Sequence, residues 1–317
     1  MNKPLIIVGG PTASGKSDTA VSLAGMINGS VISADSMQAY RKMDIGTAKV
    51  SEKEMAGIKH YGIDILDPSS EYNVSDFKEM ACKAIDEIYA NLKVPVITGG
   101  TGFYIQAVLY DIDFNKDAGA DDSIRAKLYE YYENNGKTAL HDILKDIDPK
   151  SAEAIHENNV KRVIRAIEYF RMTGNKISDH NEAERAKESP YDYLYFALTW
   201  PREILYEKID KRVDIMMDSG LLKETEELYK IKDTLSKTAR EAIGYREMFE
   251  YYDGIVSLEE AVSNIKLNSR HYAKRQETWL RREKNVIFID RSSFNSAYET
   301  AEYMYKNYVN KLLQKND

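Results

Sequence analysis

The sequence predicts an α/β fold, with a parallel sheet, helices on both of its faces and a helical insertion. Two observations support this prediction. Apolar runs that favour strands alternate with helix patterns along residues 4–98. The first run, Pro4–Gly9, leads directly into Gly10–Ser17, which reads Gly-Pro-Thr-Ala-Ser-Gly-Lys-Ser. This segment matches the phosphate-loop pattern G-x-x-x-x-G-K-[ST], so the expected core is of the P-loop NTPase-like type.

The phosphate loop is the strongest functional signal in the chain. A helix is expected over Lys16–Met26, so the loop precedes a helix N-terminus, where backbone N–H groups can surround a di- or triphosphate. Lys16 adds a positive charge, and the Ser17 hydroxyl is a candidate ligand for Mg²⁺. A glycine-rich turn without a ligand is the alternative. The candidate phosphate-binding residues are Gly10, Pro11, Thr12, Ala13, Ser14, Gly15, Lys16 and Ser17.

Three further apolar runs predict strands, at Ser30–Ala34, His60–Leu66 and Val94–Thr98. A helix pattern over Ser75–Leu92 separates the last two. Alternating strands and helices favour a parallel sheet, in which ligands bind beyond the carboxyl ends of the strands. Residues that directly follow a strand are therefore expected to face the same crevice as the phosphate loop.

Two polar segments stand at such strand ends. Asp35 follows the second strand, and its carboxylate is a candidate Mg²⁺ ligand or general base, with a turn or helix-capping role as the alternative. Gly99–Gly102 follows the strand at Val94–Thr98 and places Thr101 among three glycines. Glycines allow a backbone to approach a ligand closely, and Thr101 adds a hydroxyl. A tight strand-to-helix turn is the alternative for this segment.

The pattern changes at residues 111–122, an acidic stretch that contains glycine. Helix patterns follow at Ser123–Asn134, Thr138–Ile147 and Val160–Met172. A polar stretch over residues 173–190 then closes this part of the chain. These features together indicate a helical insertion.

Strand character returns at Tyr193–Thr199. The alternation of strands and helices is expected to resume from there to a last strand at Val286–Asp290, followed by a closing helix. The predicted organisation is an α/β core made of residues 1–115 and 191–317, interrupted by a helical insertion at residues 116–190.

The composition excludes some classes of protein. The chain has 317 residues, which favours about two domains, and a formal net charge of −7 with a pI of about 5.5. It therefore does not coat nucleic acid by bulk charge, and any nucleic-acid site must be a local basic patch. Its single cysteine, Cys82, excludes an internal disulfide and favours a reduced, cytoplasmic location. No apolar run approaches the roughly 18 residues of a membrane-spanning helix, so no membrane partner is expected.

Two basic stretches stand out against this acidic background, Asn159–Arg171 and Lys266–Lys284. The basic residues of the second are Lys266, Arg270, Lys274, Arg275, Arg281, Arg282 and Lys284. The first three are four positions apart and are expected on one helix face. Tyr272 and Trp279 lie among them, and basic side chains with aromatic rings suit single-stranded RNA, whose bases stack on such rings. An ordinary solvated helix face is the alternative.

Taken together, these motifs resemble the bacterial tRNA dimethylallyltransferases. The matching segments are residues 10–17, 35–40 (Asp-Ser-Met-Gln-Ala-Tyr), 44–49 (Asp-Ile-Gly-Thr-Ala-Lys), 99–104 (Gly-Gly-Thr-Gly-Phe-Tyr), 162–168 (Arg-Val-Ile-Arg-Ala-Ile-Glu), 243–247 (Ile-Gly-Tyr-Arg-Glu) and 273–282 (Ala-Lys-Arg-Gln-Glu-Thr-Trp-Leu-Arg-Arg). They stand in the order of the family and span nearly the whole chain. Val50, Phe103 and Arg246 depart from it, at positions where Pro, Leu and Lys are frequent. The zinc module of eukaryotic relatives is absent, so the chain is bacterial in type.

The resemblance implies a reaction. Such enzymes transfer a dimethylallyl group from dimethylallyl diphosphate to the exocyclic amine of the adenosine just 3′ of the tRNA anticodon. The core would then bind the donor, with the diphosphate leaving group in the phosphate loop and Mg²⁺ on Ser17. Asp35 would orient the amine and take its proton. Thr101 and Arg212 would contact the diphosphate or the reacting centre, which makes Asp35, Thr101 and Arg212 the implied catalytic residues.

The resemblance also implies where tRNA binds. The helical insertion would hold the anticodon stem-loop from one side and the basic helix around residues 270–282 from the other. The implied tRNA-binding residues are Asp35, Ser36, Met37, Gln38, Thr101, Arg125, Asn159, Val160, Lys161, Arg162, Val163, Arg165, Tyr245, Arg246, Arg270, Lys274, Arg275, Gln276, Trp279 and Arg282. A monomer is expected.

Three other functions are compatible with parts of the sequence. A P-loop kinase of small molecules or nucleotides would use the same loop for ATP and Asp35 as its base, but has no need of the basic stretch. A non-catalytic, nucleotide-controlled RNA-binding switch leaves Asp35 and Thr101 without a role. A transferase that prenylates free adenine nucleotides has no need of the insertion. An assay for phosphoryl transfer from ATP separates the first alternative from the prenyl transferase.

Overall fold

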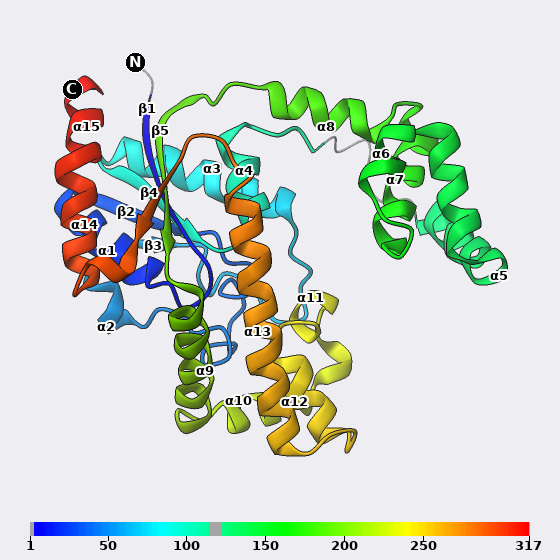
Figure 1. The fold of residues 1–317 in the computed structure, drawn as a ribbon. Coiled ribbons are helices and arrows are strands. Elements are labelled where there is room, and N and C mark those ends of the chain that lie inside the picture. Colours follow the sequence, from blue (N-terminus) through cyan, green and yellow to red (C-terminus); the bar gives the residue numbers. More distant parts are fainter. Residues whose placement is uncertain (1–2, 115–121, 317) are drawn as a thin grey trace. The chain divides into compact units, whose positions relative to one another are not determined.

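The core is a six-stranded sheet, seen in a computed structural model that describes residues 3–114 and 122–316 (Figure 1). The strand order is β3-β2-β4-β1-β5-β6, and every pairing is parallel, which confirms the predicted fold class. The strands are β1 (Lys3–Gly9), β2 (Gly29–Ser33), β3 (His60–Tyr61), β4 (Val94–Gly99), β5 (Tyr191–Thr199) and β6 (Val286–Asp290).

Both faces of the sheet are covered, as a run of apolar residues without alternation predicts. Ile6 and Val8 of β1 pack into a core with α1 (Lys16–Met26) and α14 (Ala297–Met304). Ile7 points to the opposite face, because successive side chains of a strand alternate, and it is equally inaccessible to solvent. The helices α3 (Val74–Ala90) and α4 (Gly102–Leu109) pack against each other and against β4. The central position of β1 brings the phosphate loop to the middle of the sheet edge.

One predicted strand is much shorter in the structure. The sequence predicted a strand over His60–Leu66, but β3 ends at Tyr61. Gly62 and Asp64 follow with φ values of 81° and 54°, and this left-handed backbone cannot continue a strand. Leu66 forms only an isolated parallel bridge with Tyr40.

The predicted alternation does not resume after β5. Residues 200–285, all of which the structure describes, contain no strand, so the crossover to β6 is entirely helical. Its α-helices are α9 (Arg202–Asp218), α10 (Leu221–Tyr229), α11 (Lys237–Arg240), α12 (Tyr245–Tyr252) and α13 (Leu258–Leu280). They pack around a core of their own that includes Val213, Leu221, Met248 and Ile265. This crossover lies beside the carboxyl ends of the strands and supplies walls to the site described below (Figure 1).

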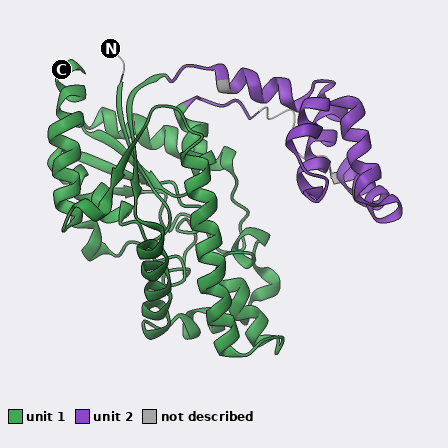
Figure 2. Ribbon diagram, in the orientation of Figure 1, with its two compact units in different colours: residues 1–109, 190–317 green, residues 110–189 purple. Residues whose placement is uncertain are grey.

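Residues 110–189 form a second compact unit, separate from the unit formed by residues 1–109 and 190–317 (Figure 2). Its helices are α5 (Asp122–Ile147), α6 (Pro149–Ala154), α7 (Val160–Thr173) and α8 (Ile177–Ala186). Gly136, with φ 80° and ψ 173°, interrupts α5 between the two helix patterns seen in the sequence. The stretch predicted to be merely polar contains α8, whose Ile177 packs against the core of the unit.

The remaining elements complete the core unit. The capping box of Ser51 and Glu54 begins the short helix α2 (Glu52–Met55). After β6 the chain closes with α14, a π-helical turn at Tyr305–Val309 and α15 (Asn310–Asn316), as the sequence predicted. None of the helices in the described part of the chain is long and apolar enough to cross a membrane.

Candidate active site

The site lies at the carboxyl ends of β1, β2 and β4, where two cavities adjoin. The smaller has a volume of about 60 Å³ and is lined by Lys16 and Ser17 of the phosphate loop. The larger, of about 480 Å³, extends between the loop after β2 and the helices α9, α11, α12 and α13. The residues that line both cavities are Thr12, Asp35, Arg212 and Tyr272. The structure therefore brings together the phosphate loop and two of the predicted catalytic residues, all within one compact unit.

The smaller cavity is electropositive. Burial, together with the neighbouring Arg212, lowers the pKa of Lys16 to about 8, although Asp35 opposes this shift. Burial likewise lowers the pKa of Arg212, although Asp35 and Asp18 partly compensate. The Lys16 Nζ donates to the carbonyl of Pro11 at 3.2 Å. Two cations whose charged forms are disfavoured by burial would both be stabilised by a polyanion, so this cavity suits a diphosphate.

Asp35 stands at the junction of the two cavities. Its Oδ1 accepts a hydrogen bond from the Met37 amide at 3.0 Å, so it also forms the turn that the sequence left open as an alternative. Ser36 and Met37 line the larger cavity, while Gln38 is buried and lines the smaller one. A carboxylate held by one backbone amide between two cavities can accept a proton from a group bound in either of them.

The glycine-rich loop after β4 packs closely against side chains of α13, a role that the sequence did not indicate. A Cβ on Gly100 would lie 2.0 Å from the Gln276 Nε2, and one on Gly102 would lie 2.2 Å from the Trp279 Cδ1. The glycines therefore make room for side chains of α13. Thr101 is half-buried between them, and its amide donates to the Ala34 carbonyl at 3.3 Å.

Gln276 connects two loops of the site. It is 6% exposed, its Oε1 accepts from the Thr12 amide at 2.8 Å, and its Nε2 donates to the Gly100 carbonyl at 3.1 Å. The sequence assigned Gln276 to tRNA binding, whereas the structure places it between the phosphate loop and the glycine-rich loop. Tyr272, one helical turn earlier, lines both cavities and was not among the predicted site residues. Burial raises its pKa to about 12, so its hydroxyl is protonated at neutral pH.

Some basic side chains of the face predicted on α13 form ion pairs with carboxylates of α9. Arg270 forms two contacts with Asp210 of α9, at 2.5 and 2.7 Å, and Lys266 pairs with Asp214 at 2.5 Å. The exposed basic residues of this stretch are Lys274, Arg275, Arg281, Arg282 and Lys284. Trp279 is half-buried and meets the ring of Phe103 edge-on, with the ring centroids 6.2 Å apart. The surface that α13 offers to a ligand is thus its C-terminal half.

Two predicted tRNA contacts are wrong as side-chain contacts. Tyr245 is fully buried, and its hydroxyl donates to Glu224 at 2.6 Å. Val163 is also inaccessible and belongs to the core of the insertion, where Val160 packs against it. Both positions lie in motifs with exposed neighbours, but their own side chains face inward because a helix must bury one face.

Apart from the buried Gln38 and Gln276, the other predicted RNA-binding residues are at least partly accessible. Arg246 lines the larger cavity and pairs with the buried Glu247. In the insertion, the exposed residues are Asn159, Lys161, Arg162 and Arg165. Arg125 and Arg165 both pair with Glu168, at 3.1 and 3.2 Å, and this carboxylate is completely buried.

The donor set of the smaller cavity fits a divalent cation shared with a phosphate group. The Ser17 hydroxyl and the Asp35 carboxylate line it, and Mg²⁺ prefers such oxygen ligands. In residues 3–114 and 122–316 no group of three or more His, Cys, Asp or Glu side chains could hold a metal alone. A cation here would therefore depend on oxygens of a bound phosphate, as is usual for Mg²⁺.

The chain is similar to known prenyl transferases over nearly its full length. A family model described as IPP transferase matches residues 38–283, and one described as isopentenyl transferase matches residues 3–68. A tRNA dimethylallyltransferase of Lachnoclostridium phytofermentans is 53% identical, over 93% of this chain and 94% of that protein. One of Acetivibrio thermocellus is 47% identical, with 93% and 94% covered.

Solved structures agree with these relatives. A tRNA isopentenylpyrophosphate transferase of Bacillus halodurans superposes with a TM-score of 0.74 at 42% identity, covering 100% of this chain and 98% of that one. A eukaryotic dimethylallyltransferase, described as acting on tRNA, gives a TM-score of 0.82 at 28% identity, covering 96% and 79%. The chain therefore belongs to the tRNA dimethylallyltransferase family and is an enzyme of this type.

Proposed function

We propose that this enzyme transfers the dimethylallyl group of dimethylallyl diphosphate to the exocyclic amine of the adenosine just 3′ of the anticodon in tRNA. The observation that carries the proposal is the pair of adjoining cavities that share Asp35 and Arg212. The electropositive cavity at the phosphate loop suits the donor diphosphate. The larger one has room for a nucleoside that has left the anticodon stack.

The transfer then follows from these positions. The amine nitrogen forms a bond to the allylic carbon, the carbon–oxygen bond of the donor breaks, and diphosphate leaves with the electron pair. The amine proton passes to the carboxylate of Asp35. Lys16, Arg212 and the backbone N–H groups at the start of α1 stabilise the charge on the leaving diphosphate. Mg²⁺ bound at Ser17 would add positive charge at the same oxygens.

Thr101 and Tyr272 support the reacting centre. Tyr272 lines both cavities and Thr101 lies at the N-terminus of α4, next to the buried link that Gln276 makes. Neutral hydroxyls of this kind donate hydrogen bonds to a phosphate oxygen without adding charge. Their role is to orient the donor so that its allylic carbon faces the amine.

The tRNA binds through the exposed basic residues of α13 and of the insertion. At α13 these are Lys274 and Arg275 on the helix and Arg282 just after it, and in the insertion they include Lys161, Arg162 and Arg165. Arg246 contacts the RNA from the wall of the larger cavity. The insertion, residues 116–190 in the predicted division, serves as the RNA-binding part, and residues 1–115 and 191–317 as the catalytic part.

We also propose that the enzyme is a cytoplasmic monomer. Every residue that lines the two cavities belongs to the core unit of one chain, so no second copy is needed to complete the site. Sedimentation of the enzyme with and without tRNA tests the monomer. A dimer in both states would contradict it.

The experiment that tests the function compares acceptors and donors. Each of three acceptors is incubated with labelled dimethylallyl diphosphate and, in a parallel reaction, with γ-labelled ATP. The acceptors are unmodified tRNA, AMP and a small alcohol such as glycerol. We expect label only in tRNA and only from dimethylallyl diphosphate. Label in AMP would favour a free-nucleotide prenyl transferase, and phosphoryl transfer from ATP to any acceptor would favour a P-loop kinase. The Asp35→Ala variant serves as the inactive control.

A further inference from the structure

The segment Asp44–Lys49, which reads Asp-Ile-Gly-Thr-Ala-Lys, has no part in the proposed reaction. It nevertheless forms walls of both cavities. Gly46 and Thr47 line the larger cavity, and Ala48 lines the smaller one. The position of this segment therefore sets the shape of the site where the two cavities meet.

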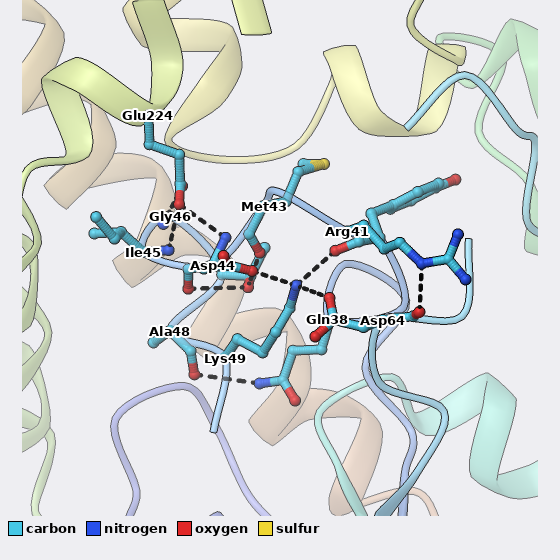
Figure 3. Close-up of polar contacts among 12 residues, drawn as sticks. Gln38, Arg41, Met43, Asp44, Ile45, Gly46, Ala48, Lys49, Asp64 and Glu224 are labelled. Carbon is cyan, nitrogen blue, oxygen red and sulfur yellow. Dashed lines mark hydrogen bonds and ion pairs between the residues drawn. The ribbon is translucent and has the colours of Figure 1, made fainter. Parts of the chain in front are cut away.

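One carboxylate holds the segment from the side of α10. The Glu224 Oε2 accepts from the amides of Asp44 and Ile45 at 2.9 and 2.7 Å. Its Oε1 accepts from the Gly46 amide at 2.9 Å and from the Tyr245 hydroxyl at 2.6 Å. Figure 3 shows Glu224 above this run of three backbone amides. A carboxylate that accepts four hydrogen bonds has most of its acceptor capacity filled, so Glu224 fixes three consecutive residues at once.

Tyr245 supports the same arrangement from α12. A Cβ on Gly46 would lie 2.7 Å from the Tyr245 Cζ, so only glycine allows this close approach of ring and backbone. Burial raises the pKa of Tyr245 well above its usual value, and the Glu224 carboxylate raises it further. The hydroxyl is therefore protonated at neutral pH and donates to Glu224.

Lys49 holds the segment from the opposite side. Its side chain is only 6% exposed, and its Nζ donates to the Tyr40 carbonyl at 2.6 Å and to the carboxylates of Asp44 and Asp64 at 2.5 Å each (Figure 3). Three acceptors use the three protons of the ammonium group. The segment is thus held by the half-buried Glu224 on one side and by the shielded ammonium group of Lys49 on the other, and neither residue lines a cavity.

The held segment in turn contacts the catalytic residues. The Thr47 carbonyl lies 3.5 Å from the Arg212 Nη2 and accepts its hydrogen bond. The Gln38 Nε2 donates to the Ala48 carbonyl at 3.3 Å, and its Oε1 accepts from Ser33 at 3.1 Å, which ties the segment to the turn that carries Asp35. A displacement of residues 44–47 would therefore move the carbonyl that accepts the hydrogen bond of Arg212.

We propose that Glu224, together with Tyr245, is a positioning residue for the transfer reaction. It holds residues 44–47 so that the Thr47 carbonyl keeps the guanidinium of Arg212 at the junction of the two cavities. The proposal rests on the proposed function, in which Arg212 acts on the donor diphosphate. It reassigns Tyr245 from RNA contact to support of this segment.

The first test compares single-turnover transfer rates at saturating donor and tRNA. Glu224→Gln replaces one acceptor oxygen with a donor that faces amide N–H groups, and Tyr245→Phe removes only the hydroxyl. The matched control is Tyr252→Phe, which removes a hydroxyl that donates to the Leu222 carbonyl at 2.6 Å in the same helical cluster. We expect losses of about 10–100-fold for Glu224→Gln and about 3–10-fold for Tyr245→Phe, as for a misplaced catalytic group. Equal losses in all three variants would overturn the proposal.

A double-mutant cycle separates positioning from general stability. If Glu224 acts through Arg212, Glu224→Gln should cost less than about threefold in an Arg212→Ala background, because no guanidinium remains to be placed. A full additional loss in that background would show that Glu224 acts elsewhere and would overturn the proposal.

Hydrogen exchange of the backbone amides tests, independently of enzyme activity, whether Glu224 holds the segment. We expect faster exchange over residues 44–46 in Glu224→Gln than in the wild type, with unchanged exchange over residues 10–17. Unchanged exchange over residues 44–46 would overturn the proposal, because the amides would then not depend on Glu224. Failure of the wild type to label tRNA would instead contradict the proposed function, and the exchange result would still decide whether Glu224 holds the segment.

Discussion

The side-chain oxygen of Gln276 accepts a hydrogen bond from the backbone amide of Thr12 at 2.8 Å, and so joins α13 to the phosphate loop. The side-chain Nε2 of Gln276 donates to the Gly100 carbonyl at 3.1 Å. A helix that carries exposed basic residues at its C-terminal half is therefore coupled directly to the phosphate loop. RNA bound along α13 would contact an element that also shapes the diphosphate site.

The first prediction concerns this link. Gln276→Ala removes two buried hydrogen bonds and leaves the Thr12 amide and the Gly100 carbonyl without their partner, which costs about 1–3 kcal/mol each. Donor affinity and the melting temperature should both fall, whereas the affinity for tRNA should change little. Titration calorimetry with each substrate checks this. A selective loss of tRNA affinity would return Gln276 to the role of an RNA contact.

The second prediction is a pH dependence of donor binding. Because burial lowers the pKa of Lys16 to about 8, its ammonium group loses its proton as the pH rises through that value. The diphosphate prefers the charged form, so affinity for dimethylallyl diphosphate should fall above about pH 8, by at most about tenfold per pH unit. Binding at higher pH should take up a proton.

Calorimetry in buffers of different ionisation enthalpy measures this proton uptake. Lys16→Met is the matched variant. It should bind dimethylallyl diphosphate about 10–100-fold more weakly, because one charged hydrogen bond is lost. Its binding should show no proton uptake near pH 8. A wild-type affinity that stays constant from pH 7 to about 9.5 would show that Lys16 is not in the donor site.

The third prediction is that Asp35 is the general base. Asp35→Ala should lower kcat by about 10²–10⁴ without a large change in donor affinity, because the carboxylate acts on the amine proton. Rapid-quench assays with a binding control measure both quantities. Turnover within about threefold of the wild type would remove Asp35 from this role and leave it as the turn residue that it also is.

The fourth prediction separates RNA contacts from ion pairs on α13. The double variant Lys274→Ala with Arg282→Ala removes two exposed charges. Each phosphate contact on single-stranded RNA contributes about −0.7 to the slope of log affinity against log salt, so the slope should flatten by about 1.4. Arg270→Ala is the control, because its guanidinium pairs with Asp210, and it should lower stability while leaving the slope unchanged. Equal slopes for the wild type and the double variant would make this helix face an ordinary solvated one.

The parts of the site that a local motif encodes could be predicted from the sequence. The phosphate loop with Lys16 and Ser17 follows from eight consecutive residues, and Asp35 from its place after an apolar strand. The parallel sheet follows from strand runs that are apolar throughout, because such runs are buried on both faces.

Other parts depend on contacts between residues far apart in the chain. Glu224 is one of several carboxylates on α10, and nothing local distinguishes it, since its partners Asp44–Gly46 lie about 180 positions away. The family resemblance implied RNA contact for Tyr245 and Val163, but the side of a helix that is buried depends on the packing of its neighbours. The ion pair of Arg270 with Asp210 was not predicted either, because the sequence did not show that α9 lies beside α13.

In the proposed reaction, a carbon–oxygen bond of the donor breaks and the dimethylallyl carbon is transferred to RNA. The direct test uses dimethylallyl diphosphate with one label in the dimethylallyl carbon and a second in the phosphorus, incubated with unmodified tRNA under single-turnover conditions. We expect the carbon label to enter the RNA at the adenosine 3′ of the anticodon and all phosphorus label to be released as diphosphate. Phosphorus label in the RNA, or a carbon label that stays on the donor, would contradict the proposed reaction.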